Sequence, residues 1–204
     1  MSFGGTRANQ AWPGDVPPKV RASVERADAI GFELCVRPEI GRLLAVLAGG
    51  LPDGAIIGES GTGTGTGLAW MASAAPLTTR IVSYEIDEAR ARAAADLFAD
   101  DLRVTVVHGD ARELFGHGPF DLLVHDGGST GGKNPGDMVV DPTEVLKPFG
   151  TMTVDDFSPI DSWPPMFQGE LDAGRHRWLT HPDLHSTEIP VAADLSVVVA
   201  RRLQ

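Results

Sequence analysis

A glycine-rich loop behind a short apolar run is the feature of this sequence with the clearest chemical meaning. Apolar residues 55–58 lead into Glu59 and then into glycines that alternate with threonines up to Gly67. Glycines let a backbone approach a ligand closely, and a helix N-terminus offers unpaired N–H groups. We therefore predict a strand, a tight turn and a helix start that bind a nucleotide-like cofactor. The candidate residues of the loop are Gly61, Gly63, Gly65 and Thr66.

The spacing of these glycines does not fit the common phosphate-binding loops. A P-loop needs a lysine after its last glycine, and none follows here. The fingerprint Gly-x-Gly-x-x-Gly fails in both registers, because its sixth position falls on Thr66 or on Leu68. Glu59 would also repel a pyrophosphate. The loop thus favours a ligand with positive charge or hydroxyl donors, and S-adenosylmethionine, with a sulfonium, an ammonium and no phosphate, meets that description.

Acidic residues also follow the next two apolar runs. The segment 81–86 ends at Glu85 and Ile86, about 20 residues beyond the glycines, where a carboxylate can accept hydrogen bonds from ribose hydroxyls. The segment 103–108 leads into Asp110 and Ala111, where a carboxylate can accept from an adenine amino group. The alternatives are that Glu85 is a capping or surface acid, and that Asp110 is the N-cap of a short helix.

These motifs resemble those of the class I S-adenosylmethionine-dependent methyltransferases, and most of all those of the catechol and caffeoyl-coenzyme A O-methyltransferase branch. The similarity covers roughly residues 36–160 and the C-terminal hairpin. It implies that Glu85 holds the ribose, that Asp110 and Ala111 hold the adenine, and that Glu59 with the loop holds the methionine end. The motifs that carry it are Glu59-x-Gly61-x-x-x-Gly65 and the segments 81–87, 120–126, 146–150 and 154–156.

Three carboxylates follow the fourth and fifth apolar runs, Asp126 after the segment 120–125 and Asp155 with Asp156 after the segment 151–154. Ligands of parallel sheets bind outside the carboxyl ends of the strands, so these acids should converge. A divalent cation would relieve their repulsion, and oxygen ligands suit Mg²⁺, Mn²⁺ or Ca²⁺. The alternative is that Asp126 contacts the cofactor while the other two acids only begin the next loop.

The resembled branch binds its metal through an acid after strand four and an Asp-Asn pair after strand five, and the metal holds two vicinal hydroxyls of the acceptor. This sequence has Asp156 in place of the asparagine, and Ser129 in place of a lysine that assists deprotonation. Lys133 in the same loop is a candidate substitute, with a solvated surface lysine as the alternative. His125 is a second candidate base, with a packed core histidine as the alternative.

The elements that must position these residues alternate regularly between apolar runs and helix-like segments. Such alternation predicts a parallel sheet covered on both faces. The last two runs, joined by residues 192–194, predict an antiparallel hairpin at the sheet edge. The predicted fold is α/β, a Rossmann-like three-layer sandwich with a seven-stranded, mostly parallel sheet. The strands are expected at 55–58, 81–86, 103–108, 120–125, 151–154, 185–191 and 195–201, and the helices between them at 68–75, 88–99, 112–115 and 137–146.

Residues 1–50 are predicted to form an N-terminal arm and helical cap, and residues 51–204 the methyltransferase domain. The arm is expected to be loose up to about residue 17, with helices at 19–30 and 38–49 after it. Trp12 either closes over the mouth of the site or anchors a dimer. A further helix is expected from Pro164 to about Leu179, and residues 157–167 form either a substrate wall or packing for that helix.

Composition narrows the classes of partner. The net charge of −11 disfavours DNA or long RNA. The single cysteine, Cys35, and the lack of an apolar leader or spanning segment predict a cytoplasmic protein that does not enter membranes. We predict a methyltransferase that acts on an oxygen of a small phenolic molecule, and the resemblance implies a homodimer. The alternatives are a protein that binds S-adenosylmethionine without catalysis, and an NAD-dependent oxidoreductase.

Overall fold

The computed structural model describes residues 5–11, 16–127, 130–133 and 136–204. Trp12 and Ser129 lie outside these ranges. The first described element is helix α1 (Gly5–Ala11), so the prediction of a loose arm is wrong over these residues. Side chains of α1 bond the segment before α3, since Thr6 Oγ1 donates to the carbonyl of Phe32 at 2.9 Å and Asn9 Nδ2 donates to that of Val36 at 2.6 Å. Helices α2 (Pro18–Ala29) and α3 (Pro38–Gly49) follow as predicted.

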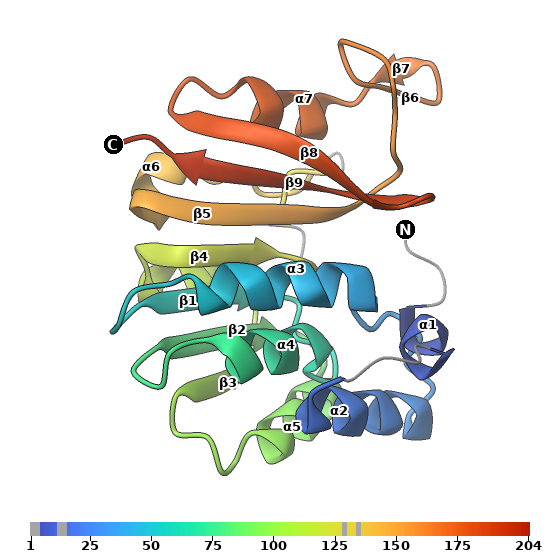
Figure 1. Cartoon of the computed structure of the whole chain (residues 1–204), viewed down its shortest axis with the longest axis vertical. Coiled ribbons are helices and arrows are strands. Elements are labelled where there is room, and N and C mark those ends of the chain that lie inside the picture. Colours follow the sequence, from blue (N-terminus) through green and yellow to red (C-terminus); the bar gives the residue numbers. More distant parts are fainter. Residues whose placement is uncertain (1–4, 12–15, 128–129, 134–135) are drawn as a thin grey trace.

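A seven-stranded sheet forms the centre of the molecule in the order β3-β2-β1-β4-β5-β9-β8 (Figure 1). The first five strands are parallel, and β9 is antiparallel to both β5 and β8. The predicted fold class and edge hairpin are confirmed. The strands are β1 (Ile56–Ser60), β2 (Arg80–Glu85), β3 (Val104–His108), β4 (Phe120–His125), β5 (Leu146–Phe157), β8 (Leu184–Ala192) and β9 (Leu195–Arg202).

Helices cover both faces of the sheet and give three layers. Strand β4 contributes Leu122 and Val124 to one hydrophobic cluster, together with side chains of α2, α3 and α4 (Thr66–Ala74). It contributes Leu123 to the other cluster, together with Trp178 of α7 (Ala173–Thr180) and Leu114 of the 3-10 helix η1 (Ala111–His117). Helix α5 (Glu88–Leu97) packs beside β3 and α2. Successive residues of a strand thus enter hydrophobic clusters on opposite faces of the sheet, which explains why the strand sequences are continuously apolar.

Two predicted helices differ from the structure. Of the segment 137–146, only α6 (Pro142–Val145) is helical, because Leu146 already begins β5 opposite Phe120. The helix expected from Pro164 begins only at Ala173, where the Asp172 side chain accepts the N–H of Arg175. Before it, β6 (Met166–Phe167) and β7 (Glu170–Leu171) form a small hairpin.

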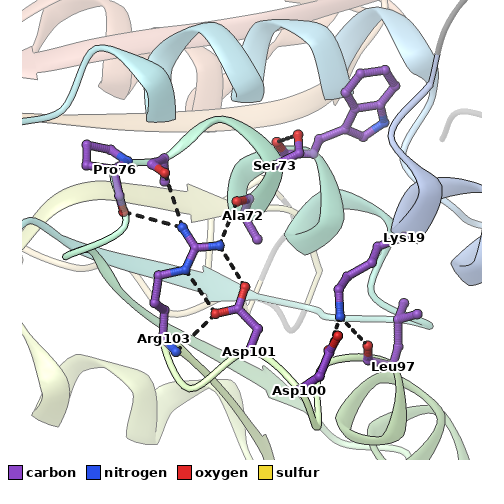
Figure 2. A network of polar contacts seen from close by, with 10 residues as sticks. Lys19, Ala72, Ser73, Pro76, Leu97, Asp100, Asp101 and Arg103 are labelled. Carbon is purple, nitrogen blue, oxygen red and sulfur yellow. Dashed lines mark hydrogen bonds and ion pairs between the residues drawn. The ribbon is translucent and has the colours of Figure 1, made fainter.

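An arginine network fixes the far end of α4, the helix that begins at the glycine loop (Figure 2). The last carbonyls of a helix lack partners within it. Arg103 supplies donors to two of them, at 2.9 Å to Ala72 and 3.1 Å to Ala75. Asp101 pairs with the same guanidinium at 2.7 Å. Lys19 nearby donates to the carbonyl of Leu97 at 2.8 Å and so ties α2 to α5.

Candidate functional site

A cavity of about 920 Å³ opens at the carboxyl ends of the parallel strands. It lies where β1 has β2 on one side and β4 on the other, which is the switch point at which open α/β sheets bind ligands. Most of the predicted site residues line it, namely Gly61, Gly63, Thr66, Glu85, Ile86, Asp110, Ala111, Asp126, Asp155 and Asp156. The predicted residues that do not line it are Glu59, Gly65, His125 and Lys133.

The glycine loop has a backbone that only glycine adopts easily. Gly61, Gly63 and Gly65 have φ values of +87°, +54° and +91°, in the left-handed region. A Cβ on Gly61 would also lie 2.4 Å from the backbone nitrogen of Gly127, in the loop after β4. The loop therefore needs its glycines for conformation and for the close approach of two strand ends.

The threonines between these glycines point into the protein. The hydroxyls of Thr62 and Ser83 lie 2.6 Å apart, and those of Thr66 and Ser23 lie 2.9 Å apart. Thr64 Oγ1 donates to the carbonyl of Ser23 at 3.0 Å. All three threonines are buried. The serine partners were missed in the sequence because they lie on other elements, one on α2 and one on β2.

Glu59 lies behind the loop and not on the cavity wall. It is 1% exposed and accepts a hydrogen bond from Ser83 at 2.5 Å. Burial raises the pKa of Glu59 to about 8, against the effect of that hydrogen bond. At neutral pH the carboxyl is therefore largely protonated. This corrects the argument that a negative Glu59 selects a cationic ligand by direct contact, since the side chain instead anchors the loop through Ser83.

Glu85 occupies its predicted place at the tip of β2. One carboxylate oxygen accepts the N–H of Gly63 at 2.7 Å, and the other accepts the guanidinium of Arg90 at 2.8 Å. Arg90 in turn lies over the ring of Phe32, 5.1 Å from its centroid. Both of these residues line the cavity and were not predicted. The sequence signal for this ion pair was the short spacing of five residues between Glu85 and Arg90, which lies in the first turn of α5.

At the tip of β3, Asp110 has a capping function as well as a place on the cavity wall. It accepts the backbone N–H of Arg112 at 2.9 Å and so caps η1. Hydrogen bonds from the same arginine lower the pKa of Asp110 to about 2. Ala111 beside it is buried, and Ile86, which also lines the cavity, is 69% exposed. Asp110 is therefore a helix cap, as the alternative for it stated, and its place on the cavity wall is also compatible with binding a ligand.

The three carboxylates after β4 and within the end of β5 do converge. Asp126, Asp155 and Asp156 each offer an oxygen, and these oxygens all lie within 4.8 Å of one another. Asp155 Oδ1 is buried without a hydrogen bond. Burial and the charges of the other two acids raise the pKa of Asp126, and burial raises that of Asp155 to about 6. Asp156 has φ +60°, a conformation that suits Asp or Asn. Hard oxygen donors at this spacing fit a divalent cation.

Lys133 lies against this cluster and is not a solvated surface lysine. Its Nζ is 3.5 Å from Asp155 Oδ1 and donates to the carbonyls of Asp126 and Asp155, at 3.3 and 3.1 Å. The side chain is 18% exposed. Burial opposes its charge, but the carboxylates outweigh this and raise the pKa of Lys133. The loop thus brings a lysine to the carboxylates from a position seven residues after Asp126.

His125 is a packed core residue, as the alternative for it states. The ring is buried, its Nδ1 lies 3.0 Å from Thr130 Oγ1, and it stacks on Trp178 with centroids 6.5 Å apart. Burial lowers its pKa to about 3. The side chain does not reach the cavity, so its position contradicts the suggestion of a general base.

A second cavity of about 760 Å³ adjoins the carboxylate cluster. It shares Gly136 and Asp156 with the first cavity, and Lys133 lines it as well. Part of the predicted substrate wall lines it too, namely Phe157, Ser158 and Phe167. The carboxylates therefore lie between two chambers, one at the glycine loop and one beneath the β6–β7 hairpin.

Comparisons with known proteins agree with this architecture. Residues 59–157 match the model of a methyltransferase domain family. No curated protein sequence is significantly similar to the chain. Among solved structures, a methyltransferase of Geobacter sulfurreducens is 21% identical with a TM-score of 0.71, covering 98% of this chain and 95% of the other. The O-methyltransferase TomG of Streptomyces achromogenes, involved in tomaymycin synthesis and solved with S-adenosylmethionine, is 19% identical with a TM-score of 0.73 over the whole of both chains.

An O-methyltransferase of Bacillus cereus, solved with S-adenosylhomocysteine, is 17% identical with a TM-score of 0.70, covering 97% of this chain and 96% of the other. Residues 59–157 thus form a methyltransferase domain, and the sheet gives it the class I architecture. The resemblance to the class I S-adenosylmethionine-dependent methyltransferases, and the enzyme class with it, is confirmed. Within the described residues, no helix is both long and apolar enough to cross a bilayer.

Proposed function

We propose that this protein binds S-adenosylmethionine in the first cavity and transfers its methyl group to a hydroxyl oxygen of a small phenolic acceptor in the second. The observation that carries the proposal is the carboxylate cluster between the two cavities, because it lies where donor and acceptor would meet. The neighbours named as O-methyltransferases support the choice of an oxygen acceptor. Alignment of two reactants in such a site can contribute about 7–11 kcal/mol.

In the first cavity the strand tips suit an adenosyl group. Glu85 would accept a ribose hydroxyl through the oxygen that bonds Gly63, because the other oxygen already accepts the N–H of Asp87 and two N–H groups of Arg90. Ile86 and Ala111 offer an apolar slot for adenine beside Asp110. The methionine end would then lie along the backbone of the glycine loop.

The carboxylates fit a divalent cation, with Asp126, Asp155 and Asp156 as its ligands. The buried Asp155 Oδ1 accepts no hydrogen bond from the described residues and has the Lys133 ammonium 3.5 Å away, so this oxygen is placed to bind a cation. A bound Mg²⁺ or similar ion would lower the pKa of an acceptor hydroxyl and hold two vicinal oxygens.

Lys133 is the residue to which we assign the proton transfer. Beside the three carboxylates Lys133 is an ammonium, and a cation bound to them would offset the charges that raise the pKa of Lys133. Its neutral amine would then take the hydroxyl proton, and the resulting ammonium would pair with Asp155, 3.5 Å away in the structure. The acceptor oxygen then attacks the methyl carbon while the bond from that carbon to sulfur breaks, and S-adenosylhomocysteine leaves as a neutral sulfide. General base catalysis of this kind contributes about 10²–10⁴-fold.

Thermal unfolding with S-adenosylmethionine, S-adenosylhomocysteine or NAD, followed by turnover on phenols and catechols, tests the proposal. Stabilisation by the first two ligands and methylation of a catechol are expected. Binding without turnover over the whole panel would instead favour the non-catalytic alternative. Stabilisation by NAD alone would favour an oxidoreductase. The homodimer is a separate proposal, which light scattering of the purified protein tests.

A further inference from the structure

Two arginines of the second cavity differ in how their charges are paired among the described residues. Arg175 and Arg177 both line this cavity from α7. Arg175 is 1% exposed and pairs with Asp172 and Glu188, each at 3.0 Å. Arg177 is half-buried, and within the part of the chain that the structure describes no ion pair or hydrogen bond engages it. Two residues apart on one helix, one guanidinium is neutralised and the other is available.

The place of Arg177 relates it to the reaction site. Its Nη1 lies 3.1 Å from the point where a Cβ on Gly132 would be, so it stands over the backbone directly before Lys133. Gly132 has φ +62° and no side chain, which leaves room for the guanidinium. The cation is therefore on the wall of the same chamber as Lys133 and Asp156.

The remainder of the chamber is mixed in character. Two of its other carboxylates have partners, since Asp172 pairs with Arg175 and Asp137 has an interaction of its own. The remaining two are Asp156 and Glu170. Glu170 is exposed on β7, and Asp156 belongs to the cluster that fits a cation. The apolar part of the wall consists of Val139, Phe157, Phe167 and Leu171. An aromatic molecule with one charged group matches such a wall.

We propose that Arg177 determines acceptor specificity by binding an anionic group of the substrate, so that the preferred acceptor is a hydroxylated aromatic carboxylic acid. The guanidinium is a planar fork that binds a carboxylate through two parallel hydrogen bonds. A local cation matters in this protein because its net charge of −11 repels anions at long range. The inference rests on the proposed function, since it places the acceptor in the second cavity.

The test compares 3,4-dihydroxybenzoate with the neutral 3,4-dihydroxybenzamide, by kcat/KM with S-adenosylmethionine and by calorimetric Kd with S-adenosylhomocysteine present. The wild type should prefer the acid by at least about tenfold, and Arg177→Gln should reduce that preference by about 10- to 100-fold with little change for the amide. Arg177→Lys should restore part of it. Arg92→Gln is the control, because Arg92 is 72% exposed on α5 and pairs with Glu88 away from both cavities.

Equal use of acid and amide by the wild type, or a preference that survives in Arg177→Gln, would overturn the specificity role while methyl transfer itself stands. If neither compound is methylated, the two calorimetric Kd values decide whether the protein prefers the acid. If neither compound binds, the specificity role of Arg177 is overturned as well. Failure of S-adenosylhomocysteine to bind would instead overturn the proposed function. The two failures are thus distinguishable.

Discussion

The Glu85 carboxylate accepts the backbone N–H of Gly63 at 2.7 Å, so the tip of β2 holds the middle of the glycine loop. The same carboxylate faces the cavity in which we place the cofactor. One side chain therefore supports the loop and, in the proposed function, would also bind the cofactor.

Substitution Glu85→Ala should weaken binding of S-adenosylhomocysteine by at least about tenfold, because hydrogen bonds to a charged group contribute about 1.5–3 kcal/mol each. Calorimetry measures the Kd. Glu88→Ala is the control, since Glu88 is 68% exposed and pairs with Arg92. An unchanged Kd for Glu85→Ala would contradict the placement of the ribose.

Substitution Lys133→Met should lower kcat by about 10²–10⁴-fold while the Kd of S-adenosylhomocysteine stays the same. It should also strengthen Mg²⁺ binding, because the ammonium no longer competes for Asp155. Lys147→Met serves as the control, since Lys147 pairs with Asp121 at 2.7 Å near the other end of β4. A variant with normal kcat would remove Lys133 from the mechanism.

Addition of Mg²⁺ should raise the melting temperature of the wild type by several degrees, since a ligand that binds only the folded state stabilises it. EDTA should reverse the change and reduce turnover. The double variant Asp126→Ala, Asp156→Ala should show no response to Mg²⁺, because it removes two of the three ligand groups. A wild type whose stability and activity ignore both additions would exclude the metal proposal.

Folding stability should depend on pH through Glu59. The folded pKa is about 8 and the unfolded value about 4.5, so the unfolded chain loses this proton first as pH rises. Stability from this residue is full below pH 4.5 and declines up to pH 8, by at most about 1.4 kcal/mol per pH unit. Glu59→Gln should reduce the slope and leave the part that comes from Asp126 and Asp155, whose pKa values are also raised, and the exposed Glu25→Gln should keep the whole slope. Urea unfolding at several pH values gives the comparison.

Substitution Gly61→Ala should destabilise the fold by about 2–4 kcal/mol, since alanine is strained at positive φ and its Cβ would meet a backbone atom. That atom is the nitrogen of Gly127, 2.4 Å away. Gly116→Ala, at an exposed position with open space, should cost almost nothing. Equal denaturation midpoints for the two variants would contradict the packing described for the loop.

The sequence predicted the parts of the site that lie at strand ends. Apolar runs locate the strands of a buried parallel sheet, and the topology then brings Glu85, Asp110 and Asp126 to one edge without further information. The N-cap alternative for Asp110 could also be predicted, because helix capping depends on residues close together in the sequence.

Residues brought in by irregular loops were harder to predict. The contact between Lys133 and Asp155 depends on the path of the loop after β4, for which the sequence has no periodicity. Arg90 and Arg177 reach the cavities with long side chains, and the direction of such side chains depends on packing that the sequence does not show. The helix expected from Pro164 failed because Gln168 and Gly169, both at positive φ, turn the chain into a hairpin first.

The inward direction of Thr62, Thr64 and Thr66 has an evolutionary consequence. The three threonines line the cavity, but their hydroxyls are bonded inside the protein. The polar groups that the loop offers to a ligand are therefore those of the main chain, which do not change when a residue is replaced. Mutations within the loop should therefore be judged by whether the protein folds, whereas drift toward a different cofactor would have to arise at Glu85, Ile86 or Asp110, where side chains face the cavity. The alternating threonines make the loop a fixed part of the scaffold and leave adaptation to the neighbouring strands.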